Sequence, residues 1–216
     1  MQVVDLSHPL KPGMQVYPGD PEFAVSSVAA IEKDGYAVCA LSLGSHTGTH
    51  VDAPAHFFAD GLTIEQIPIG MFIGPALVVD LTHKAAREEI KWEDLVQYAP
   101  RMKQGTLLLL RTGWSRHWGT PEYFDHPYLS HAAAEKVIEC GVRLIGVDSL
   151  NPDETRSDDT GVFGVHEVVL GAGGIIAENL TNLELLQDGD YVVHLVPLSI
   201  SASDGSPVRA FATKVT

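Results

Sequence analysis

The apolar residues of this chain fall in many short runs, separated by turns rich in Gly, Pro and Asp. Continuous apolar runs at residues 75–81 and 106–111 predict strands that are buried on both faces of a sheet. Shorter runs bounded by turn residues predict further strands at residues 2–6, 23–30, 37–43, 143–147, 191–198 and 208–212. The pattern therefore predicts a protein built mainly of strands.

Helices are fewer, and they are predicted at residues 92–99, 130–140 and 162–170. Ser130 suits the N-cap of the second helix, and Gly141 suits its end. Because strands outnumber helices, the sequence predicts an α/β or α+β fold with mixed β-sheets and a few helices. The length predicts a single domain over residues 1–216.

One short segment concentrates the candidate chemistry. It begins at His46 and reads His-Thr-Gly-Thr-His-Val-Asp-Ala-Pro-Ala-His, in a chain with 10 histidines among 216 residues. Imidazole and carboxylate together suit a divalent ion such as zinc or manganese. His46, His50 and Asp52 are therefore candidate metal ligands, and the segment predicts a metalloenzyme.

The spacing of these ligands requires a bend. On a straight strand, His46 and His50 would lie roughly 13 Å apart at about 3.3 Å per residue. Two nitrogens bound to one zinc ion can be separated by only about 4 Å. The chain must fold back between them, and Gly48 is the residue that permits unusual backbone dihedrals there.

His56 ends the segment and has two readings. It could be a fourth ligand or a packed histidine. It could also be a general base and acid beside the metal, because imidazole titrates near neutral pH. The catalytic role is slightly favoured.

These residues resemble the signature His-x-Gly-Thr-His-x-Asp-x-Pro-x-His of the cyclase-like metal-dependent hydrolase family, which includes bacterial kynurenine formamidases and isatin hydrolases. The opening also resembles that family, with Asp-Leu-Ser-His-Pro-Leu at residues 5–10 and Tyr-Pro-Gly-Asp at residues 17–20. So does the later run at residues 166–183, which contains Glu-Asn-Leu at 178–180. The resemblance therefore covers nearly the whole chain.

The resemblance implies more than the motif alone. His46, His50 and Asp52 would hold one metal, and Asp52 would share a second metal with His166 and Glu178. One or two ions are expected, with zinc as the first choice and manganese as the alternative. The resemblance also implies a swivelling β/β/α-type fold and assembly as a homodimer or homotetramer.

The activity implied is hydrolysis of a small-molecule amide at its C–N bond. N-formylkynurenine, giving kynurenine and formate, is the first choice of substrate, and His56 would move the proton. An isatin-type cyclic amide is the nearest alternative. A cyclase or dehydratase of the same family and a non-catalytic metal-binding protein complete the set of hypotheses.

Aromatic residues provide the candidate substrate contacts, with core packing as the alternative for each: Tyr17, Phe57, Phe58, Trp114 and Trp118. Tyr17 and Phe57 are the two chosen as substrate-binding residues. Kynurenine formamidases resembling this chain tend to have Trp where Tyr17 stands, and this departure leaves the exact substrate open.

Composition excludes several partners. A net charge of −14 argues against nucleic acid and anionic membranes. No signal peptide is recognised, and no apolar run is long enough to cross a bilayer, so the cytoplasm is expected. Cys39 and Cys140 are expected to be buried thiols. Asp148 could face a site or cap a turn, and the polar segment 151–159 could be a lid or a solvated connection.

Overall fold

The computed structural model describes residues 2–156, 163–186 and 190–215, and its main feature is a curled mixed sheet. In this part of the chain the sheet has nine strands in the order β1-β13-β11-β5-β7-β9-β10-β4-β12. The central strands β5 (Ile73–Asp80), β7 (Leu107–Arg111), β9 (Leu144–Val147) and β10 (Ile175–Glu178) are parallel. The prediction of an α/β fold with a mixed sheet is confirmed.

Antiparallel strands extend the sheet on both sides. Beside β5 lie β11 (Tyr191–His194), β13 (Phe211–Lys214) and β1 (Val3–Asp5). Beside β10 lie β4 (His50–Asp52) and β12 (Gly205–Pro207). Two short strands, β6 (Glu89–Ile90) and β8 (Tyr128–Leu129), pair separately.

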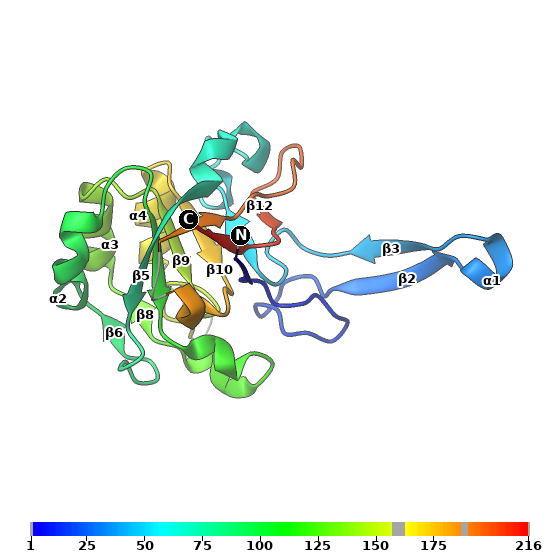
Figure 1. The fold of residues 1–216 in the computed structure, drawn as a ribbon, viewed down its shortest axis with the longest axis horizontal. Coiled ribbons are helices and arrows are strands. Elements are labelled where there is room, and N and C mark those ends of the chain that lie inside the picture. The colour runs from blue at the N-terminus through cyan, green and yellow to red at the C-terminus, as the bar shows by residue number, and fades with distance from the viewer. Residues whose placement is uncertain (1, 157–162, 187–189, 216) are drawn as a thin grey trace.

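Helices α2 (Trp92–Leu95), α3 (His131–Glu139) and α4 (Gly164–Gly171) gather over one face of the sheet (Figure 1). Strand β7 shows why a central strand carries apolar side chains on both faces of the sheet. Leu108 and Leu110 belong to the cluster that α3 and α4 join, whereas Leu107 and Leu109 belong to the cluster on the other face. Because successive side chains of a strand point to opposite faces, a continuous apolar run fits a strand covered on both sides.

A two-stranded hairpin projects away from this body (Figure 1). It consists of β2 (Ala24–Ala29) and β3 (Val38–Ser42), with the short helix α1 (Ile31–Asp34) at its tip. Nearly all of its residues are exposed, including Cys39. The expectation that Cys39 is buried is therefore wrong, because this hairpin has no second layer over it. Cys140 is half-buried, which also falls short of the buried thiol that the sequence predicted.

Other predictions differ at the ends of elements. The predicted helix at 92–99 is α2 followed by a 3-10 segment, Val96–Arg101, which contains Pro100. The predicted strand at 191–198 ends at His194, and the one at 208–212 is displaced into β12 and β13. Short apolar runs fix the presence of a strand better than its limits, because sheet pairing sets where it ends.

Asp148 does not line the candidate site, and it does not cap the turn that follows it either; it holds the segment after β7. Its carboxylate accepts hydrogen bonds from the backbone N–H groups of Thr112 and Gly113 and from the Thr112 hydroxyl. Burial raises the pKa of Asp148 to about 6, although these hydrogen bonds oppose the rise. In the polar segment 151–159, the last three positions lie outside the described residues, as does Val162 of the predicted third helix.

Helices long and apolar enough to cross a bilayer are absent from the described residues.

Candidate metal centre and catalytic cavity

The candidate ligands come from a turn, two adjacent strands and one helix. Gly48 has φ of +68° in the turn before β4, and this left-handed conformation brings His46 back toward the strand. Strand β4 pairs antiparallel with β10, and His50 is opposite Glu178. Glu178 stands at the carboxyl end of β10, the edge of a parallel sheet where binding sites commonly form.

The structure brings together all five residues that sequence and resemblance selected as ligands. His46 Nδ1 lies 2.7 Å from Asp52 Oδ1, and His50 Nε2 lies 3.4 Å from Glu178 Oε2. His166, in the first turn of α4, places Nε2 3.3 Å from Glu178 Oε1 and 3.7 Å from Asp52 Oδ2. Two potential ligand groups therefore share Asp52, one with His46 and His50 and the other with His166 and Glu178.

Three buried polar atoms in this cluster make charge contacts at 3.2 to 3.7 Å but no hydrogen bond among the described residues: His50 Nε2, Asp52 Oδ2 and Glu178 Oε1. A buried charged or polar atom without a hydrogen bond is costly, so its presence requires an explanation. All three atoms converge on the same space and belong to ligand types that suit borderline divalent ions. The residues present therefore fit a divalent cation.

Outer hydrogen bonds hold the imidazoles in place. His166 Nδ1 lies 2.6 Å from Asp153 Oδ2, and His50 Nδ1 lies 2.8 Å from the Gly48 carbonyl oxygen. Each leaves Nε2 facing the cluster, which is how protein metal sites commonly fix the orientation of a ligating histidine. Asp153 also accepts the backbone N–H groups of Val165 and His166 at the start of α4.

Sequence reasoning missed Asp153, Asn179 and Asp204. Asp153 stood in a segment that was expected to be a solvated connection, yet it is buried. Asn179 donates to the Gly48 carbonyl, and its own side-chain oxygen accepts from the Tyr123 hydroxyl. Its position next to Glu178 was the one signal available in the sequence.

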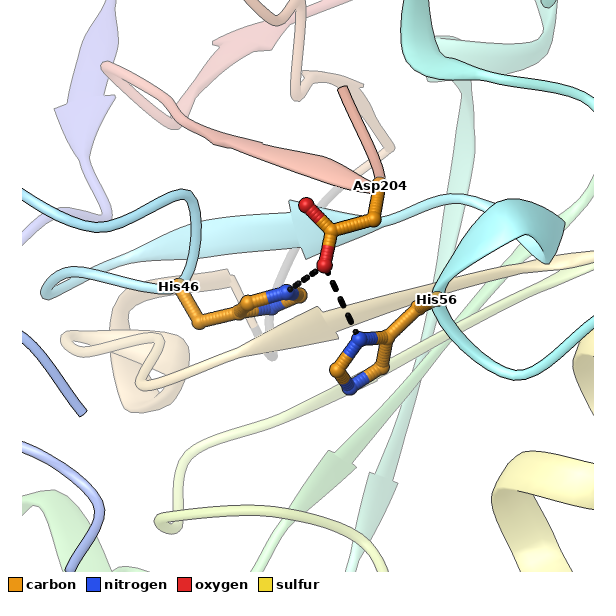
Figure 2. A group of neighbouring side chains, drawn as sticks. All are labelled: His46, His56 and Asp204. Atoms are coloured by element: carbon orange, nitrogen blue, oxygen red, sulfur yellow. Dashed lines mark hydrogen bonds and ion pairs between the residues drawn. The ribbon is translucent and has the colours of Figure 1, made fainter. Parts of the chain in front are cut away.

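Asp204 lies on the segment just before β12 and contacts two histidines of the motif (Figure 2). Its Oδ2 is 2.9 Å from His46 Nε2 and 3.2 Å from His56 Nδ1. The rings of His46 and His56 are 4.0 Å apart between centroids. His56 is thus beside the ligand cluster, with a carboxylate of its own. These contacts join residues 158 and 148 positions apart, so no local sequence pattern marks them.

A cavity of about 250 Å³ opens over the cluster. His46, His50, Asp52, His56, His166 and Glu178 all line it. Its apolar walls include Tyr17, Phe57, Trp118, Phe163 and Leu150. The structure therefore places Tyr17 and Phe57 at the cavity.

Of the other candidate aromatics, Trp118 also lines the cavity, and His8 stacks on it with 4.2 Å between ring centroids. Trp114 is packed in a buried cluster with Tyr123 and Leu150, as expected for a core residue. Phe58 lies at a separate surface groove beside α4.

The carboxylates control the charge of the histidines. Burial by itself would lower the pKa of His46, but Asp52 and Asp204 outweigh it and raise this pKa to about 9. Burial also opposes the charged form of His50, yet Asp52 and Glu178 raise the pKa of that imidazole to about 10. Without a cation, both imidazoles are therefore protonated at neutral pH.

Known proteins resemble this chain over most of its length. A family model described as "Putative cyclase" matches residues 4–154. The chain belongs to the cyclase family. Kynurenine formamidase from Bacillus cytotoxicus is 34% identical over 209 residues, which is 96% of this chain and 95% of that protein. The counterpart from Bacillus anthracis is 35% identical, with the same coverage of both chains.

Solved structures of the family agree in fold. Isatin hydrolase A from Labrenzia aggregata matches with a TM-score of 0.89 and 27% identity, covering 98% of this chain and 93% of that chain. A structure titled as a potential metal-dependent hydrolase with cyclase activity matches with a TM-score of 0.81 and 27% identity, covering 100% of this chain and 98% of that one. The family model ends before His166, Glu178 and Asp204, but these longer alignments extend over almost all of the chain.

Metal binding to this cyclase-family chain should release protons. A metal ligand must be a neutral imidazole, whereas His46 and His50 carry an extra proton below their raised pKa values of about 9 and about 10. Calorimetric titration with zinc at pH 7, in two buffers of different ionisation enthalpy, should show more than one proton released per chain. Affinity should rise between pH 7 and 9, by about tenfold per pH unit for each proton released. Proton release near zero would contradict this charge assignment.

Gly48→Ala should weaken metal binding, and Gly35→Ala should not. Both glycines have positive φ, +68° and +79°, so the backbone strain of each alanine should cost about 1–2 kcal/mol of folding free energy. A Cβ at Gly48 would also displace the Leu10 side chain, whereas a Cβ at Gly35 meets nothing within 4 Å, so Gly48→Ala should lose more stability than its control. Gly35 ends α1 at the hairpin tip, far from the cluster. The Gly48 carbonyl oxygen instead accepts a hydrogen bond from Nδ1 of His50, which is a candidate ligand. Thermal unfolding would measure the loss of stability in each variant. Chelator competition would measure the difference in metal affinity between them. Equal affinities in the two variants would show that the bend is not needed for the site.

Proposed function

We propose that this chain is a metal-dependent hydrolase that cleaves the C–N bond of a small amide, with N-formylkynurenine as its substrate and kynurenine and formate as its products. The observation that carries the proposal is the convergence of five ligand side chains and His56 at one aromatic-walled cavity. The kynurenine formamidases that the chain resembles over 96% of its length support the same activity.

We assign His46, His50 and Asp52 to one cation position, and Asp52, His166 and Glu178 to the other. Zinc is the first choice because four-coordinate zinc favours mixed His and carboxylate ligands, and manganese is the alternative. When bound, such an ion would polarise the amide carbonyl and lower the pKa of an attacking water. The buried atoms of His50, Asp52 and Glu178 without a hydrogen bond support this assignment.

His56 is the residue placed to move the proton. It lines the cavity, and its Nδ1 faces Asp204, which leaves Nε2 for a substrate group. In hydrolysis His56 takes a proton from the water that attacks the formyl carbon. It then gives that proton to the nitrogen as the C–N bond breaks, so that formate and a free amine leave.

The cavity suits a one-ring substrate. Its volume of about 250 Å³ is below the roughly 300–1,000 Å³ typical of pockets for drug-sized ligands. Tyr17, Phe57 and Trp118 can contact an aryl ring there. Asp20 also lines the cavity and offers a carboxylate to an ammonium group, which N-formylkynurenine carries and isatin lacks. The likeness to isatin hydrolase A keeps cyclic amide opening as the second candidate.

The two candidates separate in one assay. Purified protein loaded with zinc should release formate from N-formylkynurenine faster than it opens isatin, and chelation should abolish the reaction. His56→Ala should lower kcat by a factor of about 10² to 10⁴, because it removes the proton carrier. Metal content measured by elemental analysis should stay at the level of the unaltered protein. Activity that survives chelation would exclude the metal-dependent mechanism, and lost metal in His56→Ala would make His56 a ligand.

We also propose that the chain forms a homodimer or homotetramer through the β2–β3 hairpin. Val28, Ile31 and Leu41 are each more than 60% exposed there, and the two strands carry no charged residue. Isolated two-stranded hairpins are marginally stable, and free strand edges are usually protected by charge. Two copies that each carry a charge of −14 repel, so the uncharged strands of this arm are the segment that favours contact between them.

Light scattering should therefore report a multiple of the 23.3 kDa chain mass. Val28→Asp should shift it toward the monomer, because a buried charge without a partner is costly. The matched control Glu32→Gln, at the exposed tip, should leave the mass unchanged. A monomeric unaltered protein would refute the proposed assembly.

The cytoplasm is the compartment that we propose. Cys39 and Cys140 are both free thiols, as expected where disulfides are rare.

A further inference from the structure

We propose that Asp204 is a positioning residue that orients two imidazoles at once, holding Nε2–H of His46 and Nδ1–H of His56. One oxygen, Oδ2, lies within hydrogen-bond distance of both nitrogens (Figure 2). The role for His56 rests on the proposed function, because it concerns the proton that His56 moves. The role for His46 depends only on cation binding.

The backbone fixes Asp204 above the motif. The Asp204 carbonyl oxygen accepts the backbone N–H of Ala53 at 2.8 Å, immediately after β4. The next residue, Gly205, pairs with Asp52 in the sheet. A Cβ on Gly205 would come within 2.9 Å of His46 Cε1 and 2.8 Å of the Val51 carbonyl oxygen. The absence of a side chain at 205 therefore allows this segment to lie directly against the His46 ring.

The two nitrogens of His46 face different carboxylates. Nδ1 lies 2.7 Å from Asp52 Oδ1, and Nε2 lies 2.9 Å from Asp204 Oδ2. When Nε2–H donates to Asp204, the other nitrogen, Nδ1, faces the cluster beside the Asp52 oxygen, where both could reach a cation. Asp204 thus selects the tautomer in which His46 can act as a ligand, as an outer carboxylate commonly does in metal sites.

For His56 the same carboxylate holds the opposite nitrogen. With its proton on Nδ1 donated to Asp204, His56 keeps the lone pair of Nε2 for the water or the leaving nitrogen. A carboxylate that orients a catalytic imidazole in this way also stabilises the imidazolium that forms. The exposed fraction of the Asp204 side chain is 40%, so water weakens this stabilisation and the effect should be moderate.

His46, His56 and Asp204 could themselves be taken for a third cation site. The hydrogen bonding argues against that. Each of the three side chains has a hydrogen-bond partner within the group, whereas the buried atoms without a hydrogen bond belong to His50, Asp52 and Glu178. The group is therefore satisfied without an ion, and a positioning role accounts for its geometry.

The test compares Asp204→Ala with Asp60→Ala, which removes an exposed carboxylate in the turn after His56. Chelator competition should show zinc held about 10- to 100-fold more weakly in Asp204→Ala, and kcat at saturating zinc should fall by about the same factor. KM should change less than threefold. Asp204→Asn, whose amide oxygen can still accept a hydrogen bond, should recover part of both losses. Asp60→Ala should match the unaltered protein.

A double variant separates the two roles. In a His56→Ala background, Asp204→Ala should lower kcat by less than about threefold further, because residues that act as a unit are not additive. The loss of zinc affinity should persist in that background, since it acts through His46.

Three results would overturn the inference. The first is that Asp204→Ala binds zinc as tightly as Asp60→Ala does. The second is that Asp204→Ala lowers kcat as much in the His56→Ala background as it does alone. The third is that Asp204→Ala binds one ion fewer per chain than the unaltered protein. The last would make Asp204 a ligand. If the unaltered protein cleaves neither amide, the proposed function fails, but the affinity comparison still decides whether Asp204 positions His46.

Discussion

The structure depends on two carboxylates, Asp52 and Glu178, that are buried side by side between imidazoles. Burying an isolated carboxylate is unfavourable, and two of them in contact repel each other as well. Protons on His46 and His50 neutralise them in the absence of a cation, and these are the protons that a divalent ion would displace. The same pair of charges therefore explains the raised pKa values and the buried atoms without a hydrogen bond, and it favours a site for a cation over a site for an anionic group.

The sheet makes this arrangement possible because it brings distant segments into adjacent strands. β4 lies between β10 and β12, so that His50 is opposite Glu178 and Asp52 is opposite Gly205. Hydrogen bonds of the strands supply the rigidity. Asp153 and the Gly48 carbonyl hold the imidazoles of His166 and His50, and Asn179 donates to that same carbonyl. The candidate ligands are thus held in place by their neighbours, as in a preorganised site that limits the reorganisation needed during a reaction.

The walls of the cavity come from a different part of the molecule. Tyr17 and Asp20 come from the loop before the hairpin, Trp118 follows β7, and Phe163 precedes α4. These loops surround the cluster of candidate ligands, most of which lie on the sheet. Loops that vary around a common cluster would be consistent with the likeness to both formamidases and isatin hydrolases.

The sequence by itself determined the apolar strands, the capped helix after Ser130, the need for a bend at Gly48 and the local ligands His46, His50 and Asp52. These features are set by periodicity, backbone sterics and spacing along a few residues. His166 and Glu178 could be selected only by resemblance. Asp153 and Asp204 could not be selected at all, because they act through contacts with residues 13 and 158 positions away. Only the tertiary structure decided those contacts. The order of the strands and the positions of the loops depend on the free energy of the whole fold, so the residues around each Asp carry no local pattern that reveals its partner.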